Sequence, residues 1–239
     1  MEEHFFTVQP EKINQGHFTL SKSESNHLIK SLRGNPGDII WLLNGHGCAF
    51  EGLIESVQGN TVTGLIKRSI PDYGEPSFEI HLVIGLIKGS RMDMVLEKAT
   101  ELGVRSIQPI LFDRCVKNKL NFDRAKRIVQ SAAKQAGRSY FPKIYPLLDL
   151  DQWLINHAEE SNILFHIKGT NTLDQIVKIK RKLFNIIVGP EGDFSDRELT
   201  RFKAPNILNV NLGSRRLRSE TAVVAALANL NQILGNQYG

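Results

Sequence analysis

Apolar and polar positions change their periodicity along the chain. Residues 5–70 contain short apolar runs rich in β-branched and aromatic residues, and turns rich in Asn and Gly separate them. The runs cover 5–8, 39–43, 49–57 and 61–66, and residues 25–32 fit one short helix. Many short strands with frequent turn signals predict a small β-barrel over residues 1–70.

Proline and glycine then concentrate in the segment Pro71-Asp-Tyr-Gly-Glu-Pro76, which lies between two apolar regions. Such a segment is typical of a linker. We therefore expect a linker over 71–76 and a second domain over 77–239.

In the second domain apolar strands alternate with helical patterns. The expected strands cover 78–87, 107–112, 163–167, 185–188 and 207–212. The first expected helix ends at Gly103, and the last is capped by Ser219. Between them we expect helices over 124–137, 147–160 and 173–182. Alternating strands and helices predict an α/β fold with a parallel sheet.

Two glycine-marked loops near the C-terminus each follow a strand and each lead into a helix. The first is Gly189-Pro-Glu-Gly-Asp-Phe194, after which Ser195 and Glu198 have capping-box spacing. The second is Gly213-Ser-Arg-Arg-Leu-Arg218. Glycines at strand ends let the backbone approach a ligand, and parallel sheets bind nucleosides at their carboxyl ends. From the spacing alone, a nucleoside-like cofactor and two tight turns without a ligand are equally good interpretations.

Composition narrows the class of protein. The chain has 239 residues and is 41% hydrophobic, as in a globular protein, and no apolar run approaches the ~18 residues of a membrane span. The start Met1-Glu-Glu-His4 is unlike a signal peptide, so we expect a cytoplasmic location. Cys48 and Cys115 are too few for a disulfide framework, and we expect both to be reduced and structural.

Charge is unevenly divided. Residues 1–80 hold 6 Lys+Arg and 10 Asp+Glu, whereas residues 81–239 hold 24 and 15. The densest basic stretch is 114–143, with nine cations and one acid, Asp123. It predicts a surface that follows the phosphates of a polyanion, although a solvated helix face would have the same composition.

Several kinds of chemistry lack their sequence signals. No Gly-x-Gly-x-x-Gly follows a strand, and neither a Walker-type loop nor a His/Cys/Asp cluster with metal spacing is present. The nucleophile elbow Gly-x-Ser-x-Gly is also absent. Dinucleotide, metal and serine-hydrolase chemistry are therefore disfavoured.

Several motifs resemble those of the RsmE family, SPOUT-class methyltransferases that act on N3 of a uridine in 16S ribosomal RNA of the small subunit. The motifs are Gly189-Pro-Glu-Gly192 with Phe194-Ser195, the run Leu212-Gly-Ser-Arg-Arg-Leu-Arg-Ser-Glu-Thr-Ala222, Glu97 to Gly103, and Gln135-Ala-Gly-Arg138. In the first domain, His27-Leu28, Leu32-Arg33 and Gly37-Asp38 fall where a PUA-like domain has its signature. The resemblance spans nearly the whole chain.

The resemblance implies a PUA-like barrel followed by a SPOUT methyltransferase domain with a C-terminal trefoil knot. It implies S-adenosylmethionine as cofactor, bound largely by the backbone of the two loops, and a homodimer through the knotted domain. The apolar stripe of the last helix, Val223, Leu227, Leu230 and Leu234, is a candidate for that interface. The implied cofactor-binding residues are Phe165, His166, Gly189, Pro190, Glu191, Gly192, Leu212, Gly213, Leu217 and Thr221. His166 could equally be an ordinary strand histidine.

Methyl transfer from such a cofactor requires alignment of the reacting atoms and loss of one proton from the imide nitrogen. Arginines stabilise the negative charge that spreads onto the uracil oxygens, and we expect Arg138 and Arg218 in this role. Glu220 could accept the proton or orient the base, or only complement the dipole of the last helix.

The expected RNA contacts are Arg33, Arg114, Lys126, Arg127 and Lys134. At three places the sequence departs from the family pattern. Lys134 replaces a usual acidic residue, Asp113 stands where many members have glutamate, and Glu2 and Glu3 replace basic residues.

Two other functions remain open at this stage. One is a SPOUT enzyme that methylates transfer RNA, at a base or a ribose. The other is a non-catalytic RNA-binding protein of ribosome assembly.

Overall fold

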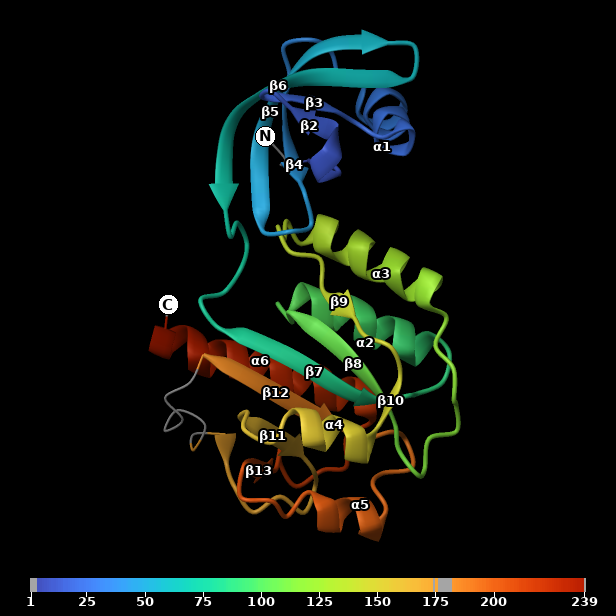
Figure 1. Ribbon diagram of the computed structural model, residues 1–239, viewed down its shortest axis with the longest axis vertical. Coiled ribbons are helices and arrows are strands. Elements are labelled where there is room, and N and C mark those ends of the chain that lie inside the picture. The colour runs from blue at the N-terminus through green and yellow to red at the C-terminus, as the bar shows by residue number, and fades with distance from the viewer. Residues whose placement is uncertain (1–3, 174, 176–181, 239) are drawn as a thin grey trace. The chain divides into compact units, whose positions relative to one another are not determined.

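The computed structural model describes residues 4–173, 175 and 182–238. The chain forms two compact units (Figure 1). The first comprises Met1–Glu75 with Ala133–Phe141, and the second comprises Pro76–Ala132 with Pro142–Gly239. The segment Ala133–Phe141, which the sequence analysis grouped with the second domain, thus joins the first unit. No helix in the described ranges has the length and apolar content needed to cross a membrane.

The first unit contains a six-stranded curled sheet where the sequence predicts a small β-barrel. Its order is β1 (Phe5–Thr7), β4 (Ile39–Leu43), β5 (Cys48–Gln58), β6 (Thr61–Pro71), β3 (His17–Thr19) and β2 (Ile13–Asn14). The β1–β4 pair is parallel and the others are antiparallel. Two register shifts between β5 and β6 increase the local twist, as β-bulges do.

Short helical segments complete this unit, around a core that includes Phe6, Phe18 and Leu42. They are the 3-10 turn Pro10–Lys12, α1 (Lys22–His27) and a π-helical turn over Leu28–Leu32. Ser21 caps α1 by accepting a hydrogen bond from the backbone N–H of Glu24.

The second unit is built on a parallel sheet. The order is β10 (Leu148–Asp149), β8 (Ser106–Leu111), β7 (Glu79–Gly85), β12 (Leu183–Val188), β11 (Asn162–Phe165) and β13 (Ile207–Val210), and β9 (Lys143–Ile144) also pairs with β8. All these pairs are parallel. Because helices cover both faces, the central strands are apolar almost throughout.

Two groups of helices cover these faces (Figure 1). On one face, α2 (Ser90–Glu101), α6 (Ser219–Tyr238) and the first part of α3 (Phe122–Gln135) enclose a core with Leu82, Ile84 and Ile186. On the other face, α4 (Leu150–Asn156) and α5 (Asp196–Arg201) enclose a core with Phe112, Trp153 and Ile187.

Most expected elements are present, and the differences have local causes. The strand β6 continues to Pro71 because it pairs with the start of β5. The expected helix 147–160 is shorter, since β10 precedes it and Asp149 caps α4 by accepting from the Gln152 N–H. The expected helix 173–182 lies mostly outside the described residues.

Parallel strands carry their carboxyl ends to the same edge of the sheet. At this edge the segments that follow β11, β12 and β13 meet, and Asn171 forms a bridge to Val210. Both glycine-marked loops lie here, which is the arrangement that the sequence predicts for a ligand site.

Candidate functional site

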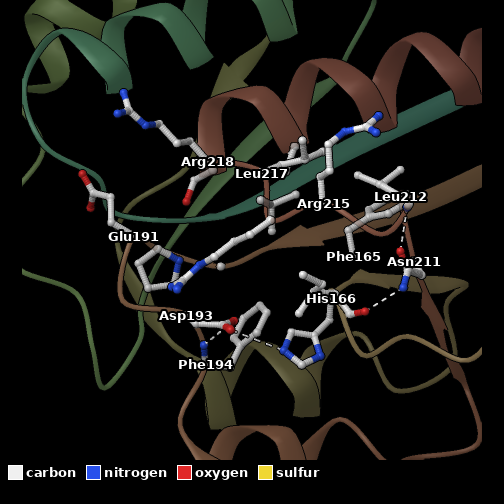
Figure 2. Close-up of a pocket in the computed structure, with 18 of the residues that line it drawn as sticks. Phe165, His166, Glu191, Asp193, Phe194, Asn211, Leu212, Arg215, Leu217 and Arg218 are labelled. Atoms are coloured by element: carbon white, nitrogen blue, oxygen red, sulfur yellow. Dashed lines mark hydrogen bonds and ion pairs between the residues drawn. The ribbon is translucent and has the colours of Figure 1, made fainter.

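A pocket of about 420 Å³ opens at the carboxyl ends of β11, β12 and β13 (Figure 2). Its size is within the usual range for small-molecule sites. Nine of the site residues expected from the sequence line it: Phe165, His166, Gly189, Pro190, Glu191, Leu212, Gly213, Leu217 and Arg218.

The first loop is fixed by hydrogen bonds and aromatic packing. Ser195 and Glu198 form the predicted capping box, in which Glu198 Oε2 accepts from the Ser195 N–H. The other carboxylate oxygen of Glu198, Oε1, accepts from the Asp113 N–H at 2.7 Å. The Phe194 ring is buried and packs edge-on against Phe112, with centroids 5.1 Å apart. A Cβ atom on Gly189 would lie 3.0 Å from the Phe194 ring, so this position has little room for a side chain.

The second loop is held by Asn211. The Asn211 side chain donates to the carbonyl of Ile167 and accepts from the Gly213 N–H, both at 2.6 Å. This residue therefore joins the segment after β11 to the loop after β13. Gly213 has a φ of 120°, which residues with a side chain rarely adopt. The space around it is open, since no described residue other than its chain neighbours would lie within 4 Å of a Cβ added there.

His166 is a pocket residue whose ring lies beside a carboxylate. Its ring Nε2 lies 3.5 Å from Asp193 Oδ2, and its backbone N–H donates to Val210 at 3.0 Å. The contact links the residue after β11 to the first loop, where Asp193 has a left-handed φ of 62°.

Arg91 links two carboxylates at one side of the pocket. Its Nη1 lies 3.4 Å from Glu191 Oε1, and its Nε lies 3.6 Å from Glu220 Oε1. The backbone N–H of Lys88 also donates to Glu191 Oε1, at 3.1 Å. The other oxygen of each carboxylate, Oε2, is buried and has no hydrogen-bond partner among the described residues. The sequence analysis missed Arg91, because its partners follow it by 100 residues or more.

Three exposed arginines of the second loop, Arg215, Arg216 and Arg218, also line the pocket. Arg215 and Arg218 lie on the side next to α6, across from Asp193 and His166 (Figure 2). The sequence analysis selected only Arg218, although Arg215 and Arg216 stand in the same quoted motif.

The other residues expected at the cofactor lie beside the pocket but do not line it. The carbonyl of Gly192 accepts from Arg114 Nη1 at 3.2 Å, so Arg114 supports the first loop. Thr221 is exposed on α6, and Glu220 lies behind Arg91 with 7% of its surface exposed. The geometry gives Gly192 and Thr221 no part in the pocket wall.

Arg138 and Lys134, which the sequence placed in catalysis and RNA binding, belong to the first unit and have internal partners there. Arg138 is 2% exposed, and its guanidinium donates to Glu75 at 2.6 Å and 3.3 Å. Lys134 Nζ lies 2.6 Å from Glu24 Oε2 and 5.2 Å from the centre of the Phe6 ring. Both side chains have a structural role, and their roles toward RNA stay predictions.

The remaining residues expected to contact RNA have exposed side chains. Arg33 ends the π-helical turn with a φ of 54°, and Lys126 and Arg127 lie on α3. Arg127 Nε donates to the carbonyl of Asp123 at 3.3 Å.

Both cysteines are free, and burial raises the pKa of the Cys115 thiol. A raised pKa disfavours the reactive thiolate, so Cys115 does not add a nucleophile to this site. Among the residues that the structure describes, no three His, Cys, Asp or Glu side chains are grouped as a metal site requires.

Comparisons with known proteins match both parts of the chain. A family model described as an RNA methyltransferase domain matches residues 74–231, and one described as an RNA methyltransferase PUA domain matches residues 20–67. Ribosomal RNA small subunit methyltransferase E of Buchnera aphidicola subsp. Schizaphis graminum is 30% identical over 94% of both chains. The Bacillus subtilis protein of the same name is 25% identical over 95% of both chains.

Two solved structures have the same fold over almost the whole chain. One is a ribosomal RNA small subunit methyltransferase E from Neisseria gonorrhoeae bound to S-adenosyl methionine, with a TM-score of 0.86 and 29% identity. The other is a protein from Legionella pneumophila described as a putative methyltransferase, in complex with the same cofactor, with a TM-score of 0.84 and 28% identity. Each comparison covers 97% of this chain and 98% of the other.

Proposed function

Since the chain belongs to the family of ribosomal RNA small subunit methyltransferases E, we propose that it methylates N3 of a uridine in 16S ribosomal RNA with S-adenosylmethionine. The observation that carries the proposal is the pocket at the carboxyl ends of β11, β12 and β13. Structural relatives with the same fold bind S-adenosylmethionine.

The residues of the pocket fit this cofactor. Phe165, Leu212 and Leu217 supply apolar surface for an adenosyl group, and the two loops supply backbone N–H and C=O groups. In the pocket wall, Glu191 holds a buried carboxylate oxygen, Oε2, without a partner among the described residues. Such an acceptor calls for a donor, and the ammonium group of the cofactor is one.

When bound, S-adenosylmethionine supplies a methyl group that is already strongly electrophilic. The chain must then align the uracil and favour loss of the N3 proton. Arg218 is exposed at the pocket, where its guanidinium can stabilise negative charge on the uracil oxygens. We assign it the main electrostatic role.

Glu220 is the carboxylate of the second motif and our candidate for the group that accepts the N3 proton or orients the base. Its Oε1 lies 3.6 Å from Arg91 Nε, and its Oε2 is buried beside the pocket without a partner among the described residues. The alternative is that Glu220 only complements the dipole of α6, since it stands in the first turn of that helix.

The proposal also covers the assembly of the enzyme and its location in the cell. A trefoil knot, a homodimer and a cytoplasmic location remain predictions from the family resemblance. The apolar stripe of α6 gives the dimer no support, because Val223, Leu227, Leu230 and Leu234 are fully buried inside the second unit. Any dimer must therefore use another surface.

Titration calorimetry with S-adenosylmethionine tests the enzyme against the non-catalytic alternative. We expect saturable binding at one site per chain and weaker binding of adenosine, which lacks the ammonium group. Absence of saturable binding by the folded protein would favour a non-catalytic RNA-binding protein of ribosome assembly.

A further inference from the structure

We infer that Arg215 and Arg216 form a phosphate-binding rim at the mouth of the pocket, which holds the RNA backbone beside the target nucleotide. The inference rests on the proposed function, because it names the part of the same site that meets the polyanion. It places the main phosphate contact on the second loop rather than on the basic segment 114–143.

The arginines of the second loop have no internal partners in the described part of the chain. Arg215, Arg216 and Arg218 form no ion pair or side-chain hydrogen bond with any residue that the structure describes. Every other described arginine of the second unit has such a partner, as Arg197 and Arg201 have in Asp151. Three adjacent cations without partners repel one another, and an external anion relieves this repulsion.

The backbone of the loop is anchored at both ends. At its start, Asn211 hydrogen-bonds the Gly213 N–H, and Leu212 packs against the core. At its end, the Arg218 carbonyl accepts from the Ala222 N–H at 2.8 Å. The arginines thus project from an anchored backbone, so binding a phosphate there costs less conformational entropy than at a free chain.

The charges around the pocket indicate which anion the arginines bind. S-adenosylmethionine carries one carboxylate but also two cationic groups, and the opposite side of the pocket already presents acidic residues, Glu191 and Asp193. A nucleotide entering the pocket brings a phosphate on each side of its ribose. The guanidinium group matches the phosphate in bidentate geometry, so Arg215 and Arg216 fit the RNA backbone better than the cofactor.

The test compares two variants that remove the same charge from the second unit. Arg215→Gln with Arg216→Gln removes the rim, and Arg197→Gln with Arg201→Gln removes two exposed arginines that already pair with Asp151. Binding of a fluorescent single-stranded oligouridylate is measured over a range of salt concentrations, and S-adenosylmethionine binding is measured by calorimetry.

We expect the rim variant to bind the oligouridylate more weakly than the wild type at low salt, by a factor of up to about ten. Its slope of log affinity against log salt should flatten by about 0.7 for each lost phosphate contact. Cofactor affinity should not change, and the control variant should keep nearly the wild-type slope.

Three results would overturn the inference. The rim variant could keep the wild-type slope, or both variants could change it equally, which would show only an effect of net charge. Alternatively, cofactor affinity could fall while the slope stays unchanged, which would assign the arginines to the cofactor carboxylate. If the wild-type protein fails to bind S-adenosylmethionine, the proposed function fails, but the salt slopes still decide whether the rim binds phosphate.

Discussion

Two basic regions of the molecule differ in what their cations already contact. In the segment 114–143, Arg114, Arg124, Lys134 and Arg138 make ion pairs or hydrogen bonds inside the protein. In the second loop, Arg215, Arg216 and Arg218 make none with the described residues. The segment holds more positive charge, but a larger fraction of the loop's cations has no internal partner among the described residues.

The difference shows that density of charge along a sequence does not measure the charge available to a partner. Lys134 and Arg138 are matched by Glu24 and Glu75, which lie 110 and 63 residues earlier in the chain. A cation already paired in the folded protein must give up that partner to bind a phosphate, whereas a free one need not.

The largest effect that we expect is on stability, when the buried Arg138 and the exposed Arg197 are each replaced. Arg138→Ala leaves Glu75 as a buried charge without its partner, and this should lower the free energy of unfolding by about 3–5 kcal/mol. Urea denaturation measures it, and Arg197→Ala, in an exposed pair, should cost at most about 1 kcal/mol.

Equal stability of the two variants would remove the structural role of Arg138. Single-turnover methylation by the folded Arg138→Ala protein then tests the catalytic role predicted from the sequence. A large loss of rate at saturating RNA would keep Arg138 in catalysis.

The next effect concerns Arg218. Arg218→Ala should lower the methylation rate at saturating RNA by ~10²–10³, because it removes a donor placed where negative charge develops. Stability and cofactor affinity should match those of the wild type, since the side chain has no described partner to lose. Rapid-quench single-turnover assays measure the rate, with Arg197→Ala as the control, and a wild-type rate would remove Arg218 from catalysis.

A smaller effect is expected from the loop glycines. Gly213→Val forces a side chain into a φ of 120°, and Gly189→Val crowds the Phe194 ring. Backbone strain of this kind costs about 1–3 kcal/mol, so S-adenosylmethionine should bind about tenfold more weakly. Calorimetry measures the affinity.

Gly59→Val provides the matched control, because Gly59 also has a positive φ, of 56°, and open space, but lies in the first unit. It should keep wild-type cofactor affinity. Wild-type affinity in both loop variants would contradict the assignment of the cofactor to this pocket.

The smallest effect is expected from the basic segment itself. Neutralising Lys126, Arg127 and Lys134 together would flatten the salt dependence of RNA binding by up to about 0.9 for each lost duplex-phosphate contact. We expect less than the Arg215 and Arg216 variant gives, because Lys134 is held by Glu24. A larger change in the triple variant would reverse our comparison of the two basic regions.

The sequence predicts well what depends on neighbouring residues. The strand β4 has the predicted bounds, the Ser195–Glu198 capping box forms, and Gly103 ends α2 with a φ of 86°. Each of these features follows from hydrogen bonding or backbone freedom within a few residues. The same holds for the two loops, whose glycines mark the ends of β12 and β13, two parallel strands that both pair with β11.

The sequence does not predict contacts between distant residues. Arg91 reaches Glu191 across 100 positions, and no local pattern distinguishes it from an ordinary helical arginine. The grouping of Ala133–Phe141 with the first unit also depends on distant pairing, including the bridge between Gly45 and Tyr140. Spacing rules describe single elements, whereas these features depend on which elements the fold brings together.

Mapping the methylated nucleoside tests the central claim most directly. 16S ribosomal RNA from a strain that lacks the protein is incubated with the purified enzyme and isotopically labelled S-adenosylmethionine, then digested and analysed by mass spectrometry. We predict labelled N3-methyluridine at one nucleotide of 16S RNA, and no labelled product in a parallel reaction with transfer RNA. A label on a ribose, on transfer RNA, or on neither RNA would contradict the account.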